Sequence, residues 1–379
     1  MKRKKRRFTF DSAHRLLETI LVGSAGGTLF MLLHLPISWM LGPLTAVVCW
    51  KAVTGRKLHW PVGLRNSGQL LLSYSMGLSF TIESARQIAG QLPVMLGSTI
   101  MMVGLSLGVA YLIAARTGIG SMSSMMGSIP GGLSQMVPLS QEIQGAEPAI
   151  VTFMQTIRML TVIITVPFLA IHGLAGAEQI HGVQNGPFAG DLSDKQVSGA
   201  SWAVIVLLPI AGMAAARLKI PTPWILGPLL VSAVFTAAGW PMPHLPKPFI
   251  IFAQLCIGIY LGLGIKLDTI GALRRLLPYS LAGACIIVTF SLALSYLLSL
   301  VYPMSLVTAF LSTAPGGLAE MGVTAITVHA DVSIVSSYQL FRLLFILLIV
   351  PYMLKWWAWR TGKNRNPQRN RDVTTNRIA

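Results

Sequence analysis

The sequence predicts an all-α protein that crosses a membrane several times, and three observations support this prediction. The 379 residues are 53% hydrophobic and only 11% charged, whereas soluble domains carry about 25% charged residues. Long apolar segments follow one another along the chain, and the basic residues gather at its two ends. Because so few charges cannot cover a water-facing surface, a soluble enzyme is not expected.

Ten apolar segments have about the length that a helix needs to cross a hydrocarbon core, roughly 17–25 residues. Glycine and proline are frequent in them, and membrane helices tolerate both. The first segment follows a basic stretch but is too long for a secretion signal and lacks a cleavage site, so we interpret it as a retained helix. We expect spans at about 18–36, 38–54, 66–82, 91–115, 149–174, 201–217, 224–240, 249–266, 277–302 and 332–354.

The net charge of +17 fits either a nucleic-acid partner or an orientation signal in a membrane. Residues 1–15 and 355–379 together carry 12 of these 17 charges. Neither tail is long enough to fold a module that reads DNA. We therefore expect no direct nucleic-acid partner, and we interpret both tails as cytoplasmic because lysine and arginine favour that side.

The chain repeats itself at an offset of 185 residues. The segment Trp39-Met-Leu-Gly-Pro-Leu44 returns as Trp224-Ile-Leu-Gly-Pro-Leu229, and Pro130-Gly-Gly-Leu133 returns as Pro315-Gly-Gly-Leu318. Matches in this order along nearly the whole chain indicate two homologous halves. The expected parts are a basic tail, a first membrane repeat, a polar linker, a second membrane repeat and a second basic tail, at 1–15, 16–175, 176–199, 200–358 and 359–379.

The two halves can face the same way or opposite ways across the membrane. Two cytoplasmic tails require an even number of crossings. If each half has five spans, the halves are inverted, and 10 of the 13 lysines and arginines in mid-chain loops lie on the cytoplasmic side. If each half has six spans, the halves are parallel, and these cations divide into 7 on the cytoplasmic side and 6 on the other. The charge distribution favours inverted repeats, while whether the Pro-Gly-Gly segments cross or re-enter the membrane stays open.

Each half carries one segment that cannot be an ordinary helix. Proline removes a helical hydrogen-bond donor, and the two glycines that follow remove side-chain restraint, so a helix must break there. Broken helices at matching positions of inverted halves indicate the central site of a transporter, and the helix N-terminus at such a break attracts anions. A tight glycine-packed crossing without a ligand is the alternative. The residues concerned are Pro130, Gly131, Gly132, Pro315, Gly316 and Gly317.

A polar residue follows each break, three positions after the second glycine. This residue is Gln135 in the first half and Glu320 in the second. A carboxylate can take up a proton and an amide cannot, so Glu320 is the candidate proton carrier.

A Gln-x-x-Arg pattern occurs near the middle of one predicted span in each half, as Gln155 with Arg158 and as Gln339 with Arg342. A spacing of three places both side chains on one helix face, and an arginine at this depth costs at least about 2.5–3.5 kcal/mol unless it is paired or solvated. Two interpretations stay open. The arginines can lock the fold through acidic residues or helix-end carbonyls, or they can bind an anionic group of a solute.

Metal and oxygen chemistry are not expected. The seven histidines are scattered, with no pair at a spacing of three or four residues, and the three cysteines lie inside apolar segments without metal-type spacing. We expect no cofactor, no metal and no catalytic residues.

The doubled Trp-x-Leu-Gly-Pro motif, the doubled Pro-Gly-Gly-Leu segment and the doubled Gln-x-x-Arg pattern resemble the bacterial AbrB-type membrane proteins, which are built from a tandem AbrB duplication domain. The resemblance covers about residues 16–358. It implies a protein of the bacterial inner membrane that is linked by label to the regulation of gene expression. The family is often labelled ammonia monooxygenase as well, a label that the scattered histidines do not support.

The leading hypothesis is a secondary transporter, or a protein on such a scaffold, for a small and potentially anionic solute. The alternative is a membrane-embedded regulator that acts on gene expression indirectly. The partners we expect are the lipid bilayer and a small solute, with proton coupling and a homo-oligomer left open. Both termini should be cytoplasmic. The expected solute site consists of the six break residues with Gln135, Gln155, Arg158, Glu320, Gln339 and Arg342.

Overall fold

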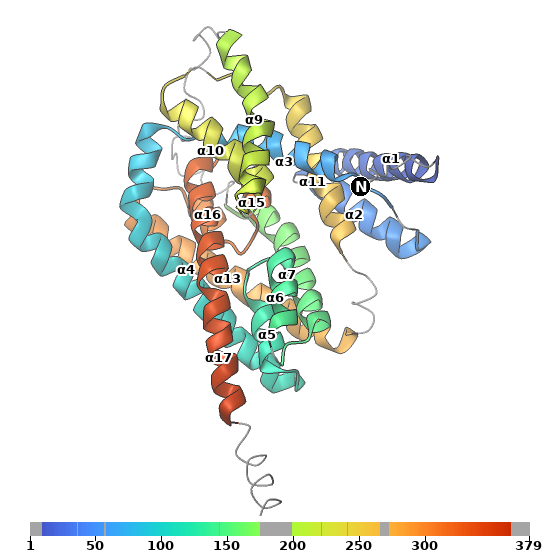
Figure 1. Cartoon of the computed structure of the whole chain (residues 1–379), viewed down its shortest axis with the longest axis vertical. Helices are drawn as coiled ribbons and strands as arrows, with labels where there is room; N and C mark the ends of the chain where they lie inside the picture. The colour runs from blue at the N-terminus through green and yellow to red at the C-terminus, as the bar shows by residue number, and fades with distance from the viewer. Residues whose placement is uncertain are drawn as a thin grey trace, which may run out of the picture. The chain divides into compact units, whose positions relative to one another are not determined.

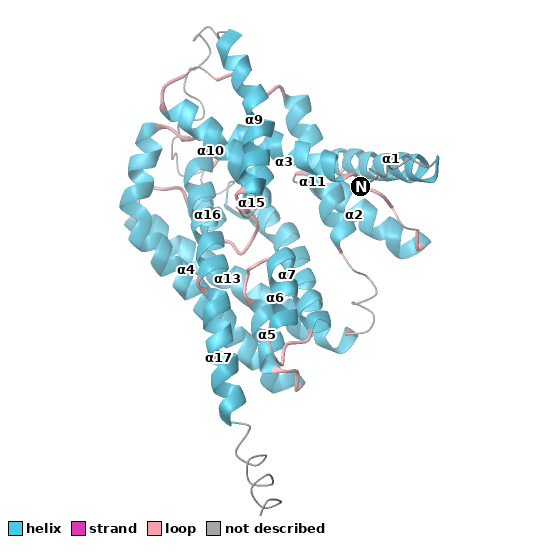
Figure 2. Ribbon diagram, in the orientation of Figure 1, coloured by secondary structure: helices cyan, strands magenta, loops and turns pink. Residues whose placement is uncertain are grey.

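A computed structural model describes most of the chain, and every regular element in the described part is helical (Figure 2). The linker predicted at 176–199, apart from its last residue, and most of both basic tails lie outside the described residues. The described residues are 10–35, 37–56, 58–143, 145–174, 199–220, 222–240, 242–265 and 273–364.

A helix overlaps each of the ten predicted spans, and Figure 1 gives the labels. In the first half these are α1 (Phe10–Leu32), α2 (Ser38–Thr54), α3 (Val62–Gly77), α4 (Ile82–Thr117) and α7 (Pro148–Phe168), the last continued by η1 (Leu169–Leu174). In the second half they are α9 (Gly199–Arg217), α10 (Pro223–Ala237), α11 (Lys247–Gly264), α13 (Leu277–Val301), preceded by η3 (Arg274–Leu276), and α16 (Val332–Leu348), followed by α17 (Val350–Asn364).

The lengths of these helices confirm a polytopic membrane protein. Within the part of the chain that the structure describes, six helical stretches are long and apolar enough to cross a membrane. One helix is longer than its predicted span at 91–115, because α4 has 36 residues and continues through Pro93. The segments His14–Leu32, Ile82–Thr117, Pro148–Leu174, Lys247–Gly264, Arg274–Val301 and Val332–Trp357 meet the length and composition of a span.

The chain divides into two compact units that do not follow the two sequence halves. Unit 1 consists of residues 1–92, 163–267 and 292–339, and unit 2 consists of residues 93–162, 268–291 and 340–379. Each unit therefore takes segments from both halves.

Unit 1 contains the first three helices of each half, and its packing is reciprocal. Helix α1 packs on α2, and α9 packs on α10 in the same manner. Helix α2 also packs on α11 of the other half, while α10 packs on α3. The halves are thus interlocked within this unit.

The repeated tryptophans occupy equivalent places in these helix pairs. A side-chain carbon added at Gly27 would meet the ring of Trp39, and one added at Gly212 would meet the ring of Trp224. The residue before each second helix, Ile37 or Thr222, has a left-handed backbone with φ of 46° or 44°. Both relations repeat at the sequence offset of 185, so the Trp-x-Leu-Gly-Pro motif packs two helices closely in each half.

Glycines also set the contacts between the halves in unit 1. A side-chain carbon at Gly77 of α3 would fall on Ser232 and on the carbonyl of Leu229, both in α10. The equivalent Gly262 of α11 stands in the same relation to α2. Helices α3 and α11 meet each other at Gly68, where an added carbon would lie 3.1 Å from the carbonyl oxygen of Ala253. Residues 68 and 253 are themselves equivalent, so the contact joins one position to its own repeat.

Unit 2 is built around sulfur-rich and aliphatic packing. One core joins α5 (Ser121–Ser128) and α6 (Leu133–Glu142) to α4, α7, α16 and α17 through residues such as Met125, Met136 and Ile346. A second core joins α4 and α7 to α13 through Phe153 and Ile287. Both cores surround the first Pro-Gly-Gly segment.

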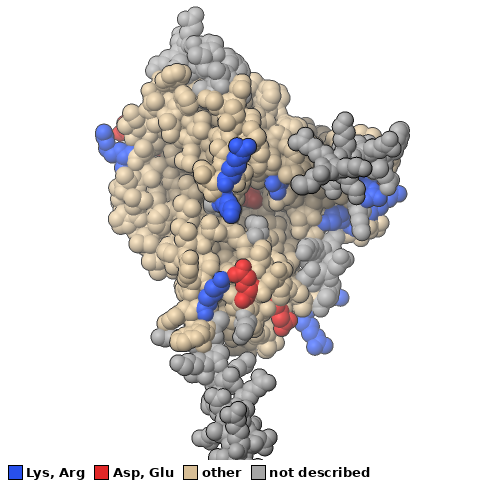
Figure 3. Space-filling view, in the orientation of Figure 1, with Lys and Arg blue, Asp and Glu red and all other residues tan. Residues whose placement is uncertain are grey.

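Charged residues are sparse on the face of the molecule that Figure 3 shows, which is mostly covered by uncharged residues. Large apolar side chains such as Leu21, Tyr111, Val234 and Leu300 are exposed. A surface of this composition suits contact with lipid, which agrees with the membrane class.

Candidate functional site

Both Pro-Gly-Gly segments break their helices as predicted. The first separates α5 from α6, and the second separates α14 (Leu306–Thr313) from α15 (Leu318–Thr327). In each break the first glycine donates its N–H to the carbonyl two residues earlier, Gly131 to Ile129 and Gly316 to Ala314, both at 2.8 Å. The chain therefore makes the same tight turn twice.

The second glycine differs between the two breaks. Gly132 has φ 79° and ψ 151°, a conformation that essentially only glycine adopts. Gly317 has φ −91° and ψ 158°, which is ordinary extended backbone. A side-chain carbon at Gly317 would instead fall on the carboxylate of Glu320. Gly132 is thus required by its backbone conformation, whereas Gly317 is required because a side chain there would meet the carboxylate of Glu320.

The predicted glutamines bind the carbonyl groups that the breaks leave without helical donors. Gln155 donates from Nε2 to the carbonyls of Met126 and Ile129, at 2.7 and 2.8 Å. Gln339 donates in the same way to Leu311 and Ala314, at 2.7 and 3.1 Å. Both glutamines are almost completely buried, with 1% and 2% exposure. Because an unpaired buried carbonyl costs roughly 1–3 kcal/mol, each glutamine stabilises the end of a broken helix.

Arg158 completes this arrangement in the first half. Its Nη2 donates to Oε1 of Gln155 at 2.7 Å, and its Nη1 donates to the carbonyl of Ser128 at 3.3 Å. The first bond confirms that amide and guanidinium share one helix face. The second places a cation at the carboxyl end of α5, where the helix dipole favours positive charge. Of the two interpretations of this arginine, contact with a helix-end carbonyl is therefore realised.

Arg158 and Arg342 are both buried, at 7% and 5% exposure. They are also close enough for their like charges to act on each other. Among the residues that the structure describes, Arg158 has no carboxylate partner, because its hydrogen bonds go to Gln155 and Ser128. Arg158 is therefore a buried cation that neutral acceptors hold in place.

The backbone at the acidic residues before α7 and α16 ties each of these helices to the helix that precedes a break, α5 or α14. The backbone N–H of Glu147 donates to Oγ of Ser123 at 2.8 Å, and that of Asp331 donates to Oγ1 of Thr308 at 3.1 Å. Asp331 also accepts hydrogen bonds from the backbone of Ser333 and Ile334 and so caps α16. These residues are architectural.

Gln135 and Glu320 lie in different compact units. Gln135 is in α6 of unit 2, and its Oε1 is buried without a hydrogen-bond partner. Glu320 is in the first turn of α15 in unit 1, beside Gly317. Gln155 and Arg158 likewise belong to unit 2, whereas Gln339 ends unit 1 and Arg342 belongs to unit 2. The structure groups the first-half residues Gln155 and Arg158 around their own break and Gln339 around the second.

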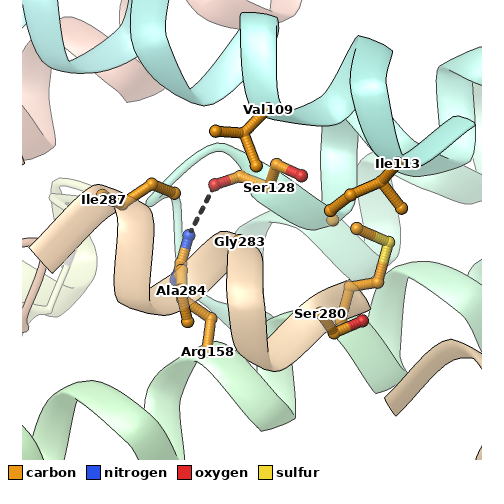
Figure 4. A pocket seen from close by; sticks show the side chains of 10 residues that line it. Val109, Ile113, Ser128, Arg158, Ser280, Gly283, Ala284 and Ile287 are labelled. Atoms are coloured by element: carbon orange, nitrogen blue, oxygen red, sulfur yellow. Dashed lines mark hydrogen bonds between the residues drawn. The ribbon is translucent and has the colours of Figure 1, made fainter. Parts of the chain in front are cut away.

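A small cavity of about 10 Å³ adjoins Arg158 in unit 2. Figure 4 shows Arg158 directed from α7 toward Ser128, whereas Ser280 lies farther along α13, with its hydroxyl directed away from Arg158. Three polar atoms of these residues are buried without partners: Nε of Arg158 and the hydroxyls of Ser128 and Ser280. The sequence pattern predicted Arg158 as a site residue, but it predicted neither of the two serines. Ser128 could have been noticed because it stands just before the Pro-Gly-Gly segment, whereas nothing in the local pattern marks Ser280.

A larger cavity of about 220 Å³ lies in unit 2 between α6, α16 and α17. Its wall is mostly apolar, with Leu139 and Ile346 among its residues, and Gln135 supplies an amide to it. Glu142 also lines this cavity and accepts a hydrogen bond from Lys355 at 2.9 Å. A small solute fits this volume.

The histidines, cysteines and carboxylates of the described residues form no group of three or more that could hold a metal ion. Cys49, Cys256 and Cys285 are free thiols. The chemistry of the region therefore comes from arginine, amide and hydroxyl groups and from backbone carbonyls.

These features define a polytopic α-helical membrane protein that carries two helix breaks, each supported by a buried glutamine. Residues 39–358 match the model of the family described as "Transition state regulatory protein AbrB". The match covers most of the chain, so the protein belongs to this AbrB family.

Two bacterial relatives are similar over nearly their whole length. A Bacillus subtilis (strain 168) protein, "Uncharacterized protein YhjN", is 26% identical over 354 residues, which cover 88% of this chain and 90% of the relative. An Escherichia coli (strain K12) protein, named as a candidate regulator AbrB, is 27% identical over 325 residues, which cover 85% of this chain and 90% of the relative.

Proposed function

We propose that this protein is a secondary transporter for a small anionic solute. The observation that carries the proposal is the doubled helix break with its buried glutamine. Gln155 and Gln339 keep two unwound segments in fixed shapes inside the protein. Unwound backbone at membrane depth survives only where protein or a water-filled cavity satisfies it, and paired broken helices are typical of transporter sites.

The proposal includes two inverted repeats. The recurrence of glutamine contacts, tryptophan packing and left-handed residues at one sequence offset supports a duplication. The distribution of loop cations supports opposite orientations of the two copies. In such transporters one repeat moves against the other around the central site.

The proposed roles follow from charge and from the cavities. Arg158 and Arg342 supply positive charge for an anion, and Gln135 lines the larger cavity. Glu320 would carry the coupled proton, because its counterpart Gln135 cannot titrate. The negative charge of the solute and the proton uptake of Glu320 together favour proton-coupled symport of an anion.

Transport can be measured with the purified protein in liposomes. Uptake of labelled chloride, acetate, phosphate or succinate into the liposomes is followed at several values of pH. Uptake is the appropriate measurement because symport of one proton with a monovalent anion moves no net charge. We expect pH-dependent uptake of at least one of these anions. Glu320→Gln should abolish the pH dependence, whereas Glu83→Gln, at an exposed carboxylate in the first turn of α4, should not. A pH dependence that survives in Glu320→Gln contradicts the proton-carrier role, and the absence of uptake of all four anions contradicts transport of this class.

A second candidate function is indirect regulation of gene expression. The name of the Escherichia coli relative and the description of the family both favour it. Deletion of residues 360–379 separates the two functions, because these residues lie beyond the predicted membrane repeats. A regulator that signals through its tail loses its effect on expression and keeps any solute flux, whereas a transporter with an indirect effect keeps both.

A further inference from the structure

The larger cavity of unit 2 is apolar and opens at the surface. It has a volume of about 220 Å³ and lies between α6, α16 and α17. Met136 and Ile346 form its buried side, whereas Pro138 and Glu142 are exposed. Apart from Gln135 and Glu142, the residues that line it are apolar. An apolar space of this size takes up hydrocarbon more readily than water or a charged solute.

A lysine lies at the edge of this cavity. The ammonium of Lys355, in α17, donates to Oε2 of the wall residue Glu142 at 2.9 Å. Both side chains are more than half exposed, at 53% and 62%, so the ion pair itself contributes little to stability. An ammonium group has three donors, and the bond to Glu142 uses one of them. Lys355 can therefore bind a second acceptor beside the cavity.

Aromatic residues place Lys355 at the level of lipid headgroups. Tyr352, Trp356 and Trp359 follow one another at spacings of four and three residues, which puts them on one face of α17. All three are exposed. Tryptophan and tyrosine at the end of a membrane span lie at the boundary between hydrocarbon and water, and the candidate span Val332–Trp357 ends here. The ammonium of Lys355 thus lies where the phosphates of a bilayer lie.

The cavity lies on the hydrocarbon side of Lys355. Its residues Ile346, Leu347 and Pro351 precede Lys355 by four to nine positions, which is roughly 6–14 Å along a helix. A lipid whose phosphate contacts Lys355 can therefore reach the cavity with an acyl chain.

The charge at this end of the chain favours an anionic lipid. Between residues 360 and 377 the sequence has six lysines or arginines and one acidic residue, Asp372. Basic residues that directly follow a membrane span attract anionic headgroups. A zwitterionic lipid gains less from such a cluster.

The charged pair at the cavity belongs to only one of the two repeats. Thr327 stands at the position equivalent to Glu142, and Ile171 stands at the position equivalent to Lys355. The pair is thus an addition to the shared architecture and not a consequence of it.

We propose that this cavity holds one acyl chain of an anionic phospholipid whose phosphate binds Lys355. The site goes beyond the proposed transport function and does not depend on it. The carboxylate of Glu142 lies beside the phosphate and opposes it by like charge. This opposition distinguishes a lipid site from an ion pair that only holds α6 against α17.

Native mass spectrometry of the full-length, delipidated protein measures the binding of phosphatidylglycerol and of phosphatidylcholine with the same acyl chains. We expect phosphatidylglycerol to bind more tightly. Lys355→Gln should weaken its affinity roughly fivefold, because one lysine near an anionic surface contributes about 1 kcal/mol. Lys247→Gln, at an exposed lysine that begins α11, is the matched control and should leave the affinity unchanged.

Glu142→Gln gives the sharpest test. It removes the negative charge beside the phosphate and should raise the affinity for phosphatidylglycerol, whereas Lys355→Gln lowers it. If the ion pair were only structural, both variants would act in the same direction. The melting temperature of each variant shows whether the fold is kept.

The cavity is tested separately from the charge. Leu139→Phe fills part of it and should lower the affinity for both lipids, whereas Leu348→Phe, at an exposed position of α16, should not. A phosphatidylglycerol with a photoreactive diazirine in its acyl chain should label α6 or α16 of the original protein, which tests the location without any substitution. Glycerol 3-phosphate has the phosphate but no chain and should not displace the lipid.

Four results would overturn the lipid site: equal affinity for the two lipids, weaker binding in Glu142→Gln, labelling of other helices only, or displacement by glycerol 3-phosphate. Displacement of the lipid by chloride, acetate, phosphate or succinate would also overturn it and would assign the cavity to a transported solute. Lipid binding without uptake of any of these anions would count against the transport function and leave the lipid site in place.

Discussion

Gln155 shows how one side chain can stabilise a broken helix. Its amide supplies two donors to the carbonyls of Met126 and Ile129, and its own oxygen accepts from Arg158. Gln155 was recognisable from the sequence because the Gln-x-x-Arg pattern occurs twice. The two carbonyl groups that it binds were not recognisable, because their residues lie 26 and 29 positions earlier in the chain. Only the fold brings these carbonyls toward α7.

We predict that Gln155→Ala destabilises the protein by about 2–4 kcal/mol. The buried carbonyl of Met126 loses its donor and Arg158 loses an acceptor, at roughly 1–3 kcal/mol each, whereas the carbonyl of Ile129 keeps the N–H of Gly131. The measurement is the free energy of unfolding in detergent. Gln87→Ala, at an exposed glutamine of α4, is the control and should change it little. Equal stability of Gln155→Ala and Gln87→Ala would show that the carbonyl of Met126 finds another donor.

The two breaks also predict opposite consequences for equivalent glycines. Gly132→Ala forces alanine into a conformation that costs about 1–3 kcal/mol, so the protein should unfold at lower denaturant concentration. Gly317→Ala meets no such backbone strain, and its methyl group displaces the flexible carboxylate of Glu320. We therefore expect Gly317→Ala to change the pH dependence of transport more than the stability. The pattern is refuted if Gly317→Ala proves the more destabilising of the two.

Residue patterns account for part of the candidate site, and their limits are physical. Proline and glycine act on the backbone next to them, so the breaks at Pro130 and Pro315 could be located from sequence. Arg158 could be singled out because charge at membrane depth is costly. Ser280 is an ordinary serine in an apolar helix, and its place in the wall of the small cavity arises only from the packing of α13 beside α4 and α7.

At the scale of the elements, small residues decide which helices can touch. Gly77 brings α3 against the backbone of α10, and Gly262 brings α11 against α2. The sequence displayed these glycines as a repeated pair but did not say that each packs on the opposite half. Apolar periodicity predicts that a helix exists and which length it has, whereas its partner depends on shapes contributed by distant segments.

We predict that Gly77→Ala destabilises the protein by about 1–3 kcal/mol, the usual cost of overpacking. The added carbon can push the hydroxyl of Ser232 aside, but the carbonyl of Leu229 belongs to a helix backbone and cannot move freely. Thermal unfolding in detergent measures the effect. Gly90→Ala in α4 has no neighbour within 4 Å and should be neutral or stabilising by about 0.5–1 kcal/mol, because alanine favours a helix over glycine. Similar stabilities for the two variants would argue against close packing at Gly77.

At the scale of the whole molecule, the transport proposal requires one orientation in the membrane. We predict that both termini are cytoplasmic and that the linker faces the outside. In a variant without Cys49, Cys256 and Cys285, a single cysteine placed at residue 185 should react with a membrane-impermeant maleimide on intact cells. A cysteine placed at residue 370 should react only after the cells are permeabilised. Labelling of residue 370 but not residue 185 on intact cells would contradict the inverted arrangement.

The contact between Gly68 and Ala253 has a consequence for the origin of the chain. Two equivalent positions that touch each other mark a local twofold axis, which is what the interface of a symmetric dimer has. A chain of half this length would bear both faces of the α3–α11 contact and could pair with a second copy of itself. In such a pair a single substitution would appear on both sides of the interface at once. Within one chain the two positions can differ, and here one is glycine and the other is alanine.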